Sequence, residues 1–139
     1  MTAKEFLRQA RNIDRRVDEA QERVERLRAR LEAGRRSSLT GMPRGGQQDW
    51  TDTADRLIEL ERRVNARIRE LVRWKLAAMD AIDLVEEANL REVLELYYID
   101  GYNWEQVAQR MGVDLRWVYR LHGRALLKVN VPEEVGHGQ

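Results

Sequence analysis

Three arginines, Arg116, Arg120 and Arg124, recur at intervals of four residues near the C-terminal end of the sequence. Residues four apart share one face of a helix, so this spacing would align three guanidinium groups along that face. A basic helix that carries guanidinium groups is favoured by a major groove lined with phosphates. The pattern therefore predicts a helix that binds double-stranded DNA.

The sequence from Asn103 to Leu126 has the spacing of a helix-turn-helix that would present these arginines. Ala108 is small enough for two helices to approach closely, and Gly112 can adopt the left-handed conformation that ends the first helix. Asn103 and Asp114 suit the N-cap positions of the two helices, so the second helix is expected from Leu115 to about Lys128. The apolar residues expected at the junction are Val107, Met111, Val113, Val118 and Leu121.

The second of these helices has two chemically different sides. Val118, Leu121, Ala125 and Leu126 are expected to point inward, with Trp104 in the core and Trp117 exposed. Between residues 110 and 130 there are five basic residues and one acid, which favours contact with a polyanion. Arg116 and Arg120 are expected to contact bases with help from Tyr119, whereas Arg110, Arg124 and Lys128 would hold phosphates. The complete predicted DNA-binding surface is Arg110, Leu115, Arg116, Trp117, Tyr119, Arg120, Arg124 and Lys128.

Residues 90–127, and MGVDLRWVYRLHGRAL in particular, resemble the promoter-binding region 4 of bacterial sigma factors. The whole chain is similar to small phage or prophage proteins of Gram-positive bacteria, through the loop SSLTGMPRGG at 37–46 and the signature NWEQVAQRMG followed by RWVYRLHGRAL. This resemblance implies a transcriptional regulator of late or packaging genes, with host RNA polymerase as a candidate partner. It also points to Leu115, Arg116, Tyr119 and Arg120 as base-contacting residues, although Leu115 stands where a basic residue is usual. The other sigma regions are not recognisable, so a complete sigma factor is not expected.

Composition limits the class of protein. The 139 residues are 35% charged and include two prolines and no cysteine, which favours long solvated helices over a large core and excludes disulfides and thiolate chemistry. Neither a membrane span nor a signal peptide is recognisable, so a cytoplasmic location in a bacterial host and no membrane partner are expected. The N-terminal 36 residues and the C-terminal helix are basic, whereas residues 47–90 carry a net negative charge.

Two long amphipathic segments precede the helix-turn-helix. The first has a heptad stripe and predicts one helix from about Thr2 to Ala33, and the second predicts a helix from about Thr53 to Glu86 capped by Thr51 or Asp52. The intervening residues 34–49 are expected to form a loop, because they are rich in Gly, Ser and Arg. A short helix from about Asn89 to Ile99 would then lead into the helix-turn-helix through a turn at Asp100–Gly101. The stripe residues of the first helix are Phe6, Ala10, Ile13, Val17, Ala20, Val24, Leu27 and Leu31.

These elements predict an all-α protein in which a long antiparallel, coiled-coil-like helical hairpin precedes a small helix-turn-helix. The expected domains are the hairpin at 1–86, the DNA-binding domain at 87–130 and a flexible tail at 131–139. Several apolar residues would stay partly uncovered on such a hairpin, which predicts a homodimer or higher homo-oligomer. These residues are Leu7, Ile58, Val72, Trp74 and Leu76.

No arrangement of residues predicts catalysis, a metal site or a cofactor. His122 and His137 have no second ligand at helical spacing, and His122 is expected to be a polar surface group. The basic loop with Arg35, Arg36 and Arg44 could be a minor-groove arm or a solvated connector. The leading hypothesis is thus a sequence-specific, double-stranded DNA-binding regulator of transcription that is not an enzyme. Alternatives are a protein-interaction adaptor that acts on the host transcription machinery and a DNA-recognition subunit of phage packaging.

Overall fold

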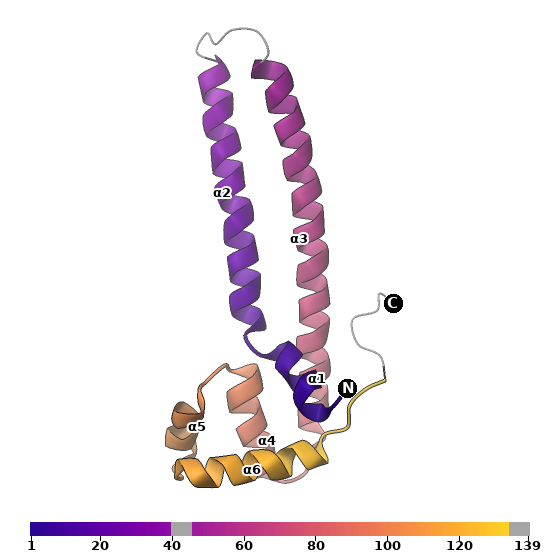
Figure 1. Cartoon of the computed structure of the whole chain (residues 1–139), viewed down its shortest axis with the longest axis vertical. Coiled ribbons are helices and arrows are strands. Elements are labelled where there is room, and N and C mark those ends of the chain that lie inside the picture. Colours follow the sequence, from indigo (N-terminus) through magenta and orange to yellow (C-terminus); the bar gives the residue numbers. More distant parts are fainter. Residues whose placement is uncertain (40–45, 134–139) are drawn as a thin grey trace. The chain divides into compact units, whose positions relative to one another are not determined.

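The computed structural model describes residues 1–39 and 46–133, and within these ranges every regular element is a helix (Figure 1). This confirms the all-α prediction. No helix in the described ranges combines the length and the apolar character that a membrane span requires. The elements in chain order are α1 (Ala3–Ala10), α2 (Ile13–Leu39), α3 (Gly46–Asp83), α4 (Ala88–Leu94), the π-helix η1 (Glu95–Ile99), α5 (Trp104–Met111) and α6 (Leu115–Lys128).

The chain packs as two compact units. One unit combines Met1–Asp14 with the chain from Glu70 onward, and we call it the C-terminal unit. The other unit, Arg15–Arg69, contains most of α2 and the first part of α3, and we call it the hairpin unit. The domain boundaries expected at residues 86 and 130 stay predictions, and the compact units divide the chain differently because α1 packs with the C-terminal helices.

The first predicted helix is interrupted, which corrects the expectation of one helix from Thr2 to Ala33. Helix α1 begins with a capping box, in which the Glu5 amide donates to Thr2 Oγ1 and the Thr2 amide donates to Glu5 Oε2, both at 3.1 Å. It ends at Ala10, and Asn12 has a φ of 64° before α2 begins at Ile13. Asparagine tolerates this left-handed conformation better than most residues, so a regular heptad stripe did not ensure a continuous helix.

The interruption allows α1 to pack on η1 and α6 within the C-terminal unit. Phe6, Leu7 and Ala10 are buried there, and the Phe6 ring lies 6.2 Å from that of Trp74 on α3. The expectation that Leu7 would be partly uncovered was wrong, because its side chain has no exposed area. The N-terminal helix is therefore a layer of the same core as the helix-turn-helix.

Helices α4, α5 and α6 form the rest of that core, and α4 and α5 each contact both η1 and α6. The short helix predicted from Asn89 to Ile99 exists as α4 followed by η1, whose π-helical geometry the sequence did not predict. Gly101 has a φ of 82°, which matches the turn expected at Asp100–Gly101. The fully buried apolar side chains of these elements include Val93, Leu94, Val107, Val118 and Ala125.

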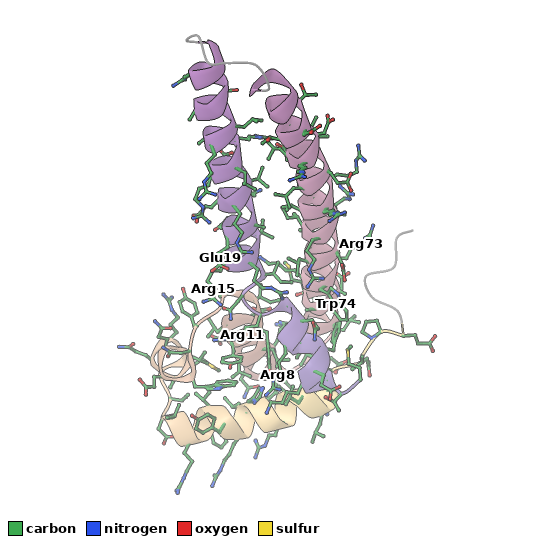
Figure 2. All side chains as sticks on the ribbon, turned by 45° about the horizontal axis from the view of Figure 1, so that its top comes forward. Arg8, Arg11, Arg15, Glu19, Arg73 and Trp74 are labelled. Carbon is green, nitrogen blue, oxygen red and sulfur yellow. The ribbon has the colours of Figure 1, made fainter. Side chains whose placement is uncertain are left out.

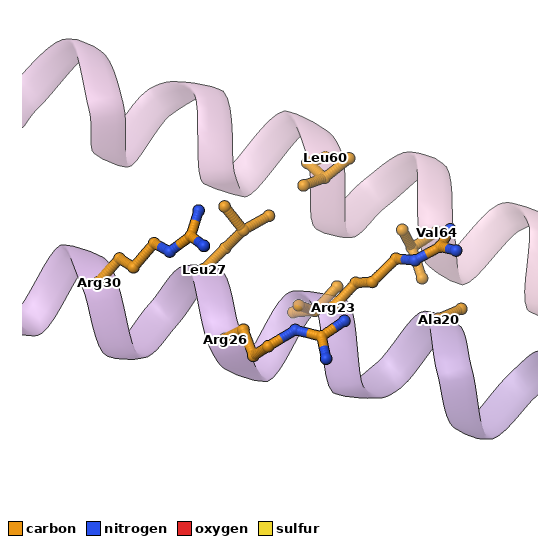
Figure 3. Close-up of a pocket in the computed structure, with 8 residues that line it drawn as sticks. Ala20, Arg23, Arg26, Leu27, Arg30, Leu60 and Val64 are labelled. Atoms are coloured by element: carbon orange, nitrogen blue, oxygen red, sulfur yellow. The ribbon is translucent and has the colours of Figure 1, made fainter.

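In the hairpin unit, α2 and α3 run side by side in opposite directions (Figure 1). The Nε atom of Arg28 donates to Glu61 Oε1 at 2.7 Å, and a cavity beside this pair is lined by Val24 of α2 and Val64 of α3. A second cavity has an apolar floor that includes Leu27 and Leu60, with arginines along α2 (Figure 3). These arginines are Arg23, Arg26 and Arg30.

The loop expected at residues 34–49 is shorter than predicted. Helix α2 continues to Leu39 and α3 begins at Gly46, so of the predicted loop only residues 40–45 lie outside the described residues. A glycine within a helix costs only about 1 kcal/mol relative to alanine, so Gly34 did not end α2. The second long helix likewise begins before Thr53 and ends at Asp83 rather than Glu86. Arg44 lies outside the described residues, so the choice between a minor-groove arm and a connector stays open.

Candidate nucleic-acid interface

Local hydrogen bonds fix both helices of the predicted helix-turn-helix. At the start of α5 the Gln106 amide donates to Asn103 Oδ1 at 2.8 Å, and the Asn103 amide donates to Gln106 Oε1 at 3.0 Å. At the start of α6 the Trp117 amide donates to Asp114 Oδ1 at 2.7 Å. Both predicted N-caps are thereby confirmed, and α6 has the bounds that the sequence indicated.

The turn between α5 and α6 depends on Gly112, whose φ of 70° and ψ of 32° lie in the left-handed region. The Val113 amide donates to the Ala108 carbonyl oxygen at 3.1 Å, which closes the C-terminal end of α5. Ala108 is buried at the crossing, as expected for a small residue between two close helices. Among the other predicted junction residues, Val107, Val118 and Leu121 are buried, whereas Met111 and Val113 are half-buried.

Helix α6 separates an apolar side from a basic side. Val118, Leu121 and Ala125 are buried, as predicted, and Leu126 is half-buried. Arg116 and Arg120 are exposed on the opposite side, four residues apart. Leu115, Arg116, Tyr119 and Arg120 line one shallow hollow on the surface, so four of the predicted residues come together there.

The remaining predicted residues lie elsewhere on the same unit, and each has a partner. The Arg110 guanidinium lies 4.1 Å from the ring centroid of Tyr102, and that of Arg124 lies 5.4 Å from the ring centroid of Trp117. Trp117 is half-buried rather than exposed as predicted, because it packs beneath this guanidinium group. Lys128 Nζ lies 3.9 Å from Glu87 Oε1, an exposed ion pair that a phosphate can replace at little cost.

An aromatic cluster supports α6 from the side of η1 and α5. The rings of Tyr97 and Trp104 are stacked with centroids 3.7 Å apart, and the His122 ring lies 4.5 Å from Trp104. Tyr98 Oη and His122 Nε2 form a hydrogen bond of 2.7 Å. Trp104 was expected in the core, and it does pack against other rings, but its side chain is only half-buried.

His122 corrects the expectation of a polar surface group, because it is half-buried within the aromatic cluster. Burial, together with the Lys4 ammonium group, lowers the pKa of His122 to about 4. Burial raises the pKa of Tyr98 to about 12. Both groups are therefore neutral at pH 7, and their hydrogen bond adds no charge to the surface of α6.

Sequence reasoning missed the N-terminal residues that reach this site. Arg11 Nε donates to the Tyr97 carbonyl oxygen at 3.2 Å, and one of its terminal nitrogens donates to the Tyr102 carbonyl oxygen at 3.3 Å. Figure 2 shows Arg8 of α1 and Arg11, the residue that follows this helix, near the C-terminal helices. The T-x-x-E capping box at Thr2 and the asparagine at position 12 were the only local signals of a separate helix.

Helices α5 and α6 form a helix-turn-helix in which α6 has an exposed basic side. Residues 87–130 match the family model described as "Sigma-70, region 4", and this match indicates a DNA-binding helix-turn-helix domain. This match confirms the sigma-like resemblance of the C-terminal helices, and it covers less than half of the chain. No curated protein and no solved structure matches the chain significantly. Among the described residues, no group of three His, Asp or Glu side chains could hold a metal ion.

Proposed function

We propose that this protein is a phage-encoded, sequence-specific double-stranded DNA-binding regulator of transcription, with α6 placed in the major groove. The observation that carries the proposal is the position of Arg116 and Arg120, which are exposed on α6 while Val118 and Leu121 hold its other side in the core. A rigid helix can hold its outward guanidinium groups so that their N–H groups donate to O6 and N7 of guanine in that groove.

The contacts divide into two kinds. Arg116 and Arg120, with Tyr119 beside them, would contact base edges because they share one hollow on the outer side of α6. Arg110, Arg124 and Lys128 would hold phosphates, and the aromatic rings below the two arginines would restrict how far their guanidinium groups move. Leu115 and Trp117 would add apolar contacts at the start of the helix.

The test begins by selecting bound duplexes from a random library, because the target sequence is not known. Arg120→Ala should reduce discrimination between the selected duplex and random DNA by about 10- to 100-fold, since one bidentate base contact contributes about 1–3 kcal/mol. Lys128→Ala should weaken binding to both duplexes by the same factor. Equal losses on both duplexes for Arg120→Ala would contradict the assignment of Arg120 to bases.

We also propose that the protein acts as a homodimer or higher homo-oligomer. Ile58 in the hairpin unit is 57% exposed, and Leu76 in the C-terminal unit is 54% exposed, so apolar surface remains on each unit separately. Two linked half-site contacts would also strengthen binding to DNA. Sedimentation equilibrium should give at least twice the monomer mass, and a large ring would instead favour the packaging role.

A protein-interaction adaptor for the host RNA polymerase is the second candidate. It is favoured by the cavity of the hairpin unit, where Arg23, Arg26 and Arg30 lie beside an apolar floor of Leu27 and Leu60 (Figure 3). A surface of this kind suits an acidic amphipathic segment of another protein. The adaptor role requires polymerase binding that survives Arg116→Ala with Arg120→Ala, together with no affinity for any duplex at two salt concentrations.

A further inference from the structure

A small cavity lies between α1 and α6 in the C-terminal unit. Its volume is about 240 Å³, and it is bounded by two cationic side chains of α1 together with aromatic residues and a histidine. Lys4 and Arg8 are both exposed, so their charged groups lie at its mouth. The residues that line it are Lys4, Arg8, Tyr97, Tyr98, Trp104, Tyr119 and His122.

The charge of this cavity is positive. No carboxylate lines it, and within residues 1–39 and 46–133 neither Lys4 nor Arg8 forms a salt bridge. His122 is neutral at pH 7 because burial lowers its pKa to about 4, with the Lys4 ammonium group as the second cause. The net positive charge therefore comes from the two α1 side chains alone, and a ligand here would be an anion.

The aromatic rings favour an oxyanion over a base or another planar ligand. One face of the Tyr97 ring is covered by Trp104 at 3.7 Å, and the Arg11 guanidinium lies over the same ring at 4.1 Å. Two groups this close to one ring centroid must occupy opposite faces, so Tyr97 offers no free face for stacking. The Tyr98 hydroxyl is already bonded to His122, whereas Lys4, Arg8 and the exposed Tyr119 place cationic and hydroxyl donors at the cavity.

The cavity lies next to the surface that we propose for DNA, and the two share one residue. Tyr119 lines both this cavity and the hollow formed by Leu115, Arg116 and Arg120. Tyr119 is 50% exposed, so its ring stands at the border between the two. A duplex whose groove received Arg116 and Arg120 would therefore carry its sugar-phosphate backbone past Tyr119 toward α1.

We propose that Lys4 and Arg8 of α1, with the hydroxyl of Tyr119, bind a backbone phosphate of the duplex whose bases α6 contacts. This inference rests on the proposed DNA-binding function. The two cations of the phosphate site lie outside residues 87–130, so a segment at the other end of the sequence completes the interface. The contact carries no base information, because phosphate contacts fix register and affinity rather than sequence.

The test compares two double variants of the whole chain. The α1 variant carries both Lys4→Gln and Arg8→Gln, and the matched control carries both Arg62→Gln and Arg63→Gln. The control removes two exposed arginines that pair with Glu59 on α3, so both variants lose the same net charge. Glutamine keeps part of each aliphatic stem and so preserves the contacts of α1 with its neighbours. An unchanged thermal melting temperature would show that α1 is still docked.

Affinity is measured for the selected duplex and a random duplex over a series of salt concentrations. The α1 variant should bind both duplexes about tenfold more weakly, and its slope of log affinity against log salt should fall by about 0.9, the value of one phosphate. The control variant should change neither the affinity for the two duplexes nor the slope of log affinity against log salt. A slope equal to that of the wild type would overturn the phosphate site while leaving the proposed function intact.

Two further outcomes are decisive. If the wild-type protein binds no duplex at all, the proposed function fails and the phosphate site with it. Inorganic phosphate provides the other comparison, followed through the NMR signals of the His122 ring. If phosphate shifts these signals in the wild type but not in the α1 variant, while both proteins bind DNA alike, the cavity binds free anions. Its assignment to a backbone phosphate of DNA is then wrong.

Discussion

The C-terminal unit and the hairpin unit are both built from amphipathic helices, yet they bury very different amounts of apolar surface. In the C-terminal unit, Phe6, Ile82 and Leu94 have no exposed area, and many neighbours are nearly as buried. In the hairpin unit, Val24 is the only buried side chain among the described residues, and it is still 9% exposed. A repeating apolar stripe therefore did not produce a core by itself.

The difference shows what each unit needs. Several helices surround α6 and hold its outer face in one orientation, which a helix that contacts bases requires. Two helices alone leave each stripe half-covered, and isolated helices gain most of their stability from packing rather than from propensity. The hairpin unit is therefore the part that we expect to gain most from a second copy or another partner.

Large-to-small substitutions in the two units should show the largest contrast. Phe6→Ala should lower the free energy of unfolding by about 3–5 kcal/mol, because it removes a fully buried ring. Val24→Ala should lower it by about 1 kcal/mol or less, since two methyl groups beside an open cavity lose little contact. Native-state hydrogen exchange would report both effects region by region, with Leu127→Ala, 86% exposed, as a neutral control. Equal losses for Phe6→Ala and Val24→Ala would remove the contrast.

Acid should weaken the C-terminal unit before the hairpin unit because of His122. Its pKa is about 4 in the folded protein and about 6.5 when unfolded, so the unfolded state binds the proton first as the pH falls. Stability is full above pH 6.5 and declines down to about pH 4, by about 2 kcal/mol after allowance for partial exposure. Urea unfolding at pH 7.5 and pH 5 would measure the decline, which His122→Gln should largely abolish. A decline of the same size in His122→Gln would assign it to other groups.

Glycine-to-alanine substitutions should give the smallest effects, and these should depend on backbone conformation rather than on the unit. Gly112→Ala should destabilise the protein by about 1–2 kcal/mol, because φ is 70° there. Gly34→Ala in α2 and Gly123→Ala in α6 should each stabilise it by about 0.5–1 kcal/mol, since an added Cβ meets nothing within 4 Å at either site. Thermal melting of the three variants would rank them. A stabilising Gly112→Ala would be incompatible with the left-handed turn.

The sequence predicted the helix-turn-helix well because its signals are local. Asn103 and Asp114 cap helices through atoms three residues away, and Gly112 closes α5 within one turn. Each of these contacts depends on residue types that lie next to one another in the chain. The bounds of α6 followed from them without any tertiary information.

Long-range packing could not be predicted in the same way. The heptad stripe assigned Phe6 and Ala10 to the same helix as Val24, and nothing in that periodicity indicated that α1 would turn away at Asn12. His122 is half-buried and bonded to the hydroxyl of Tyr98, twenty-four positions earlier, at 2.7 Å. Pairings of this kind depend on topology, which a single periodic pattern does not contain.

The hydrogen bonds of Arg11 to the carbonyl oxygens of Tyr97 and Tyr102 join segments 86 and 91 positions apart. During synthesis, α1 is made well before these acceptors, so Phe6 and Leu7 stay uncovered until Tyr97 and Tyr102 have been translated. Completion of the core is thus a late, non-local event, and it requires closure of a long loop. A stop codon before η1 would leave α1 without the surface on which it packs, and its exposed apolar side chains would then be bound by chaperones or cut by proteases.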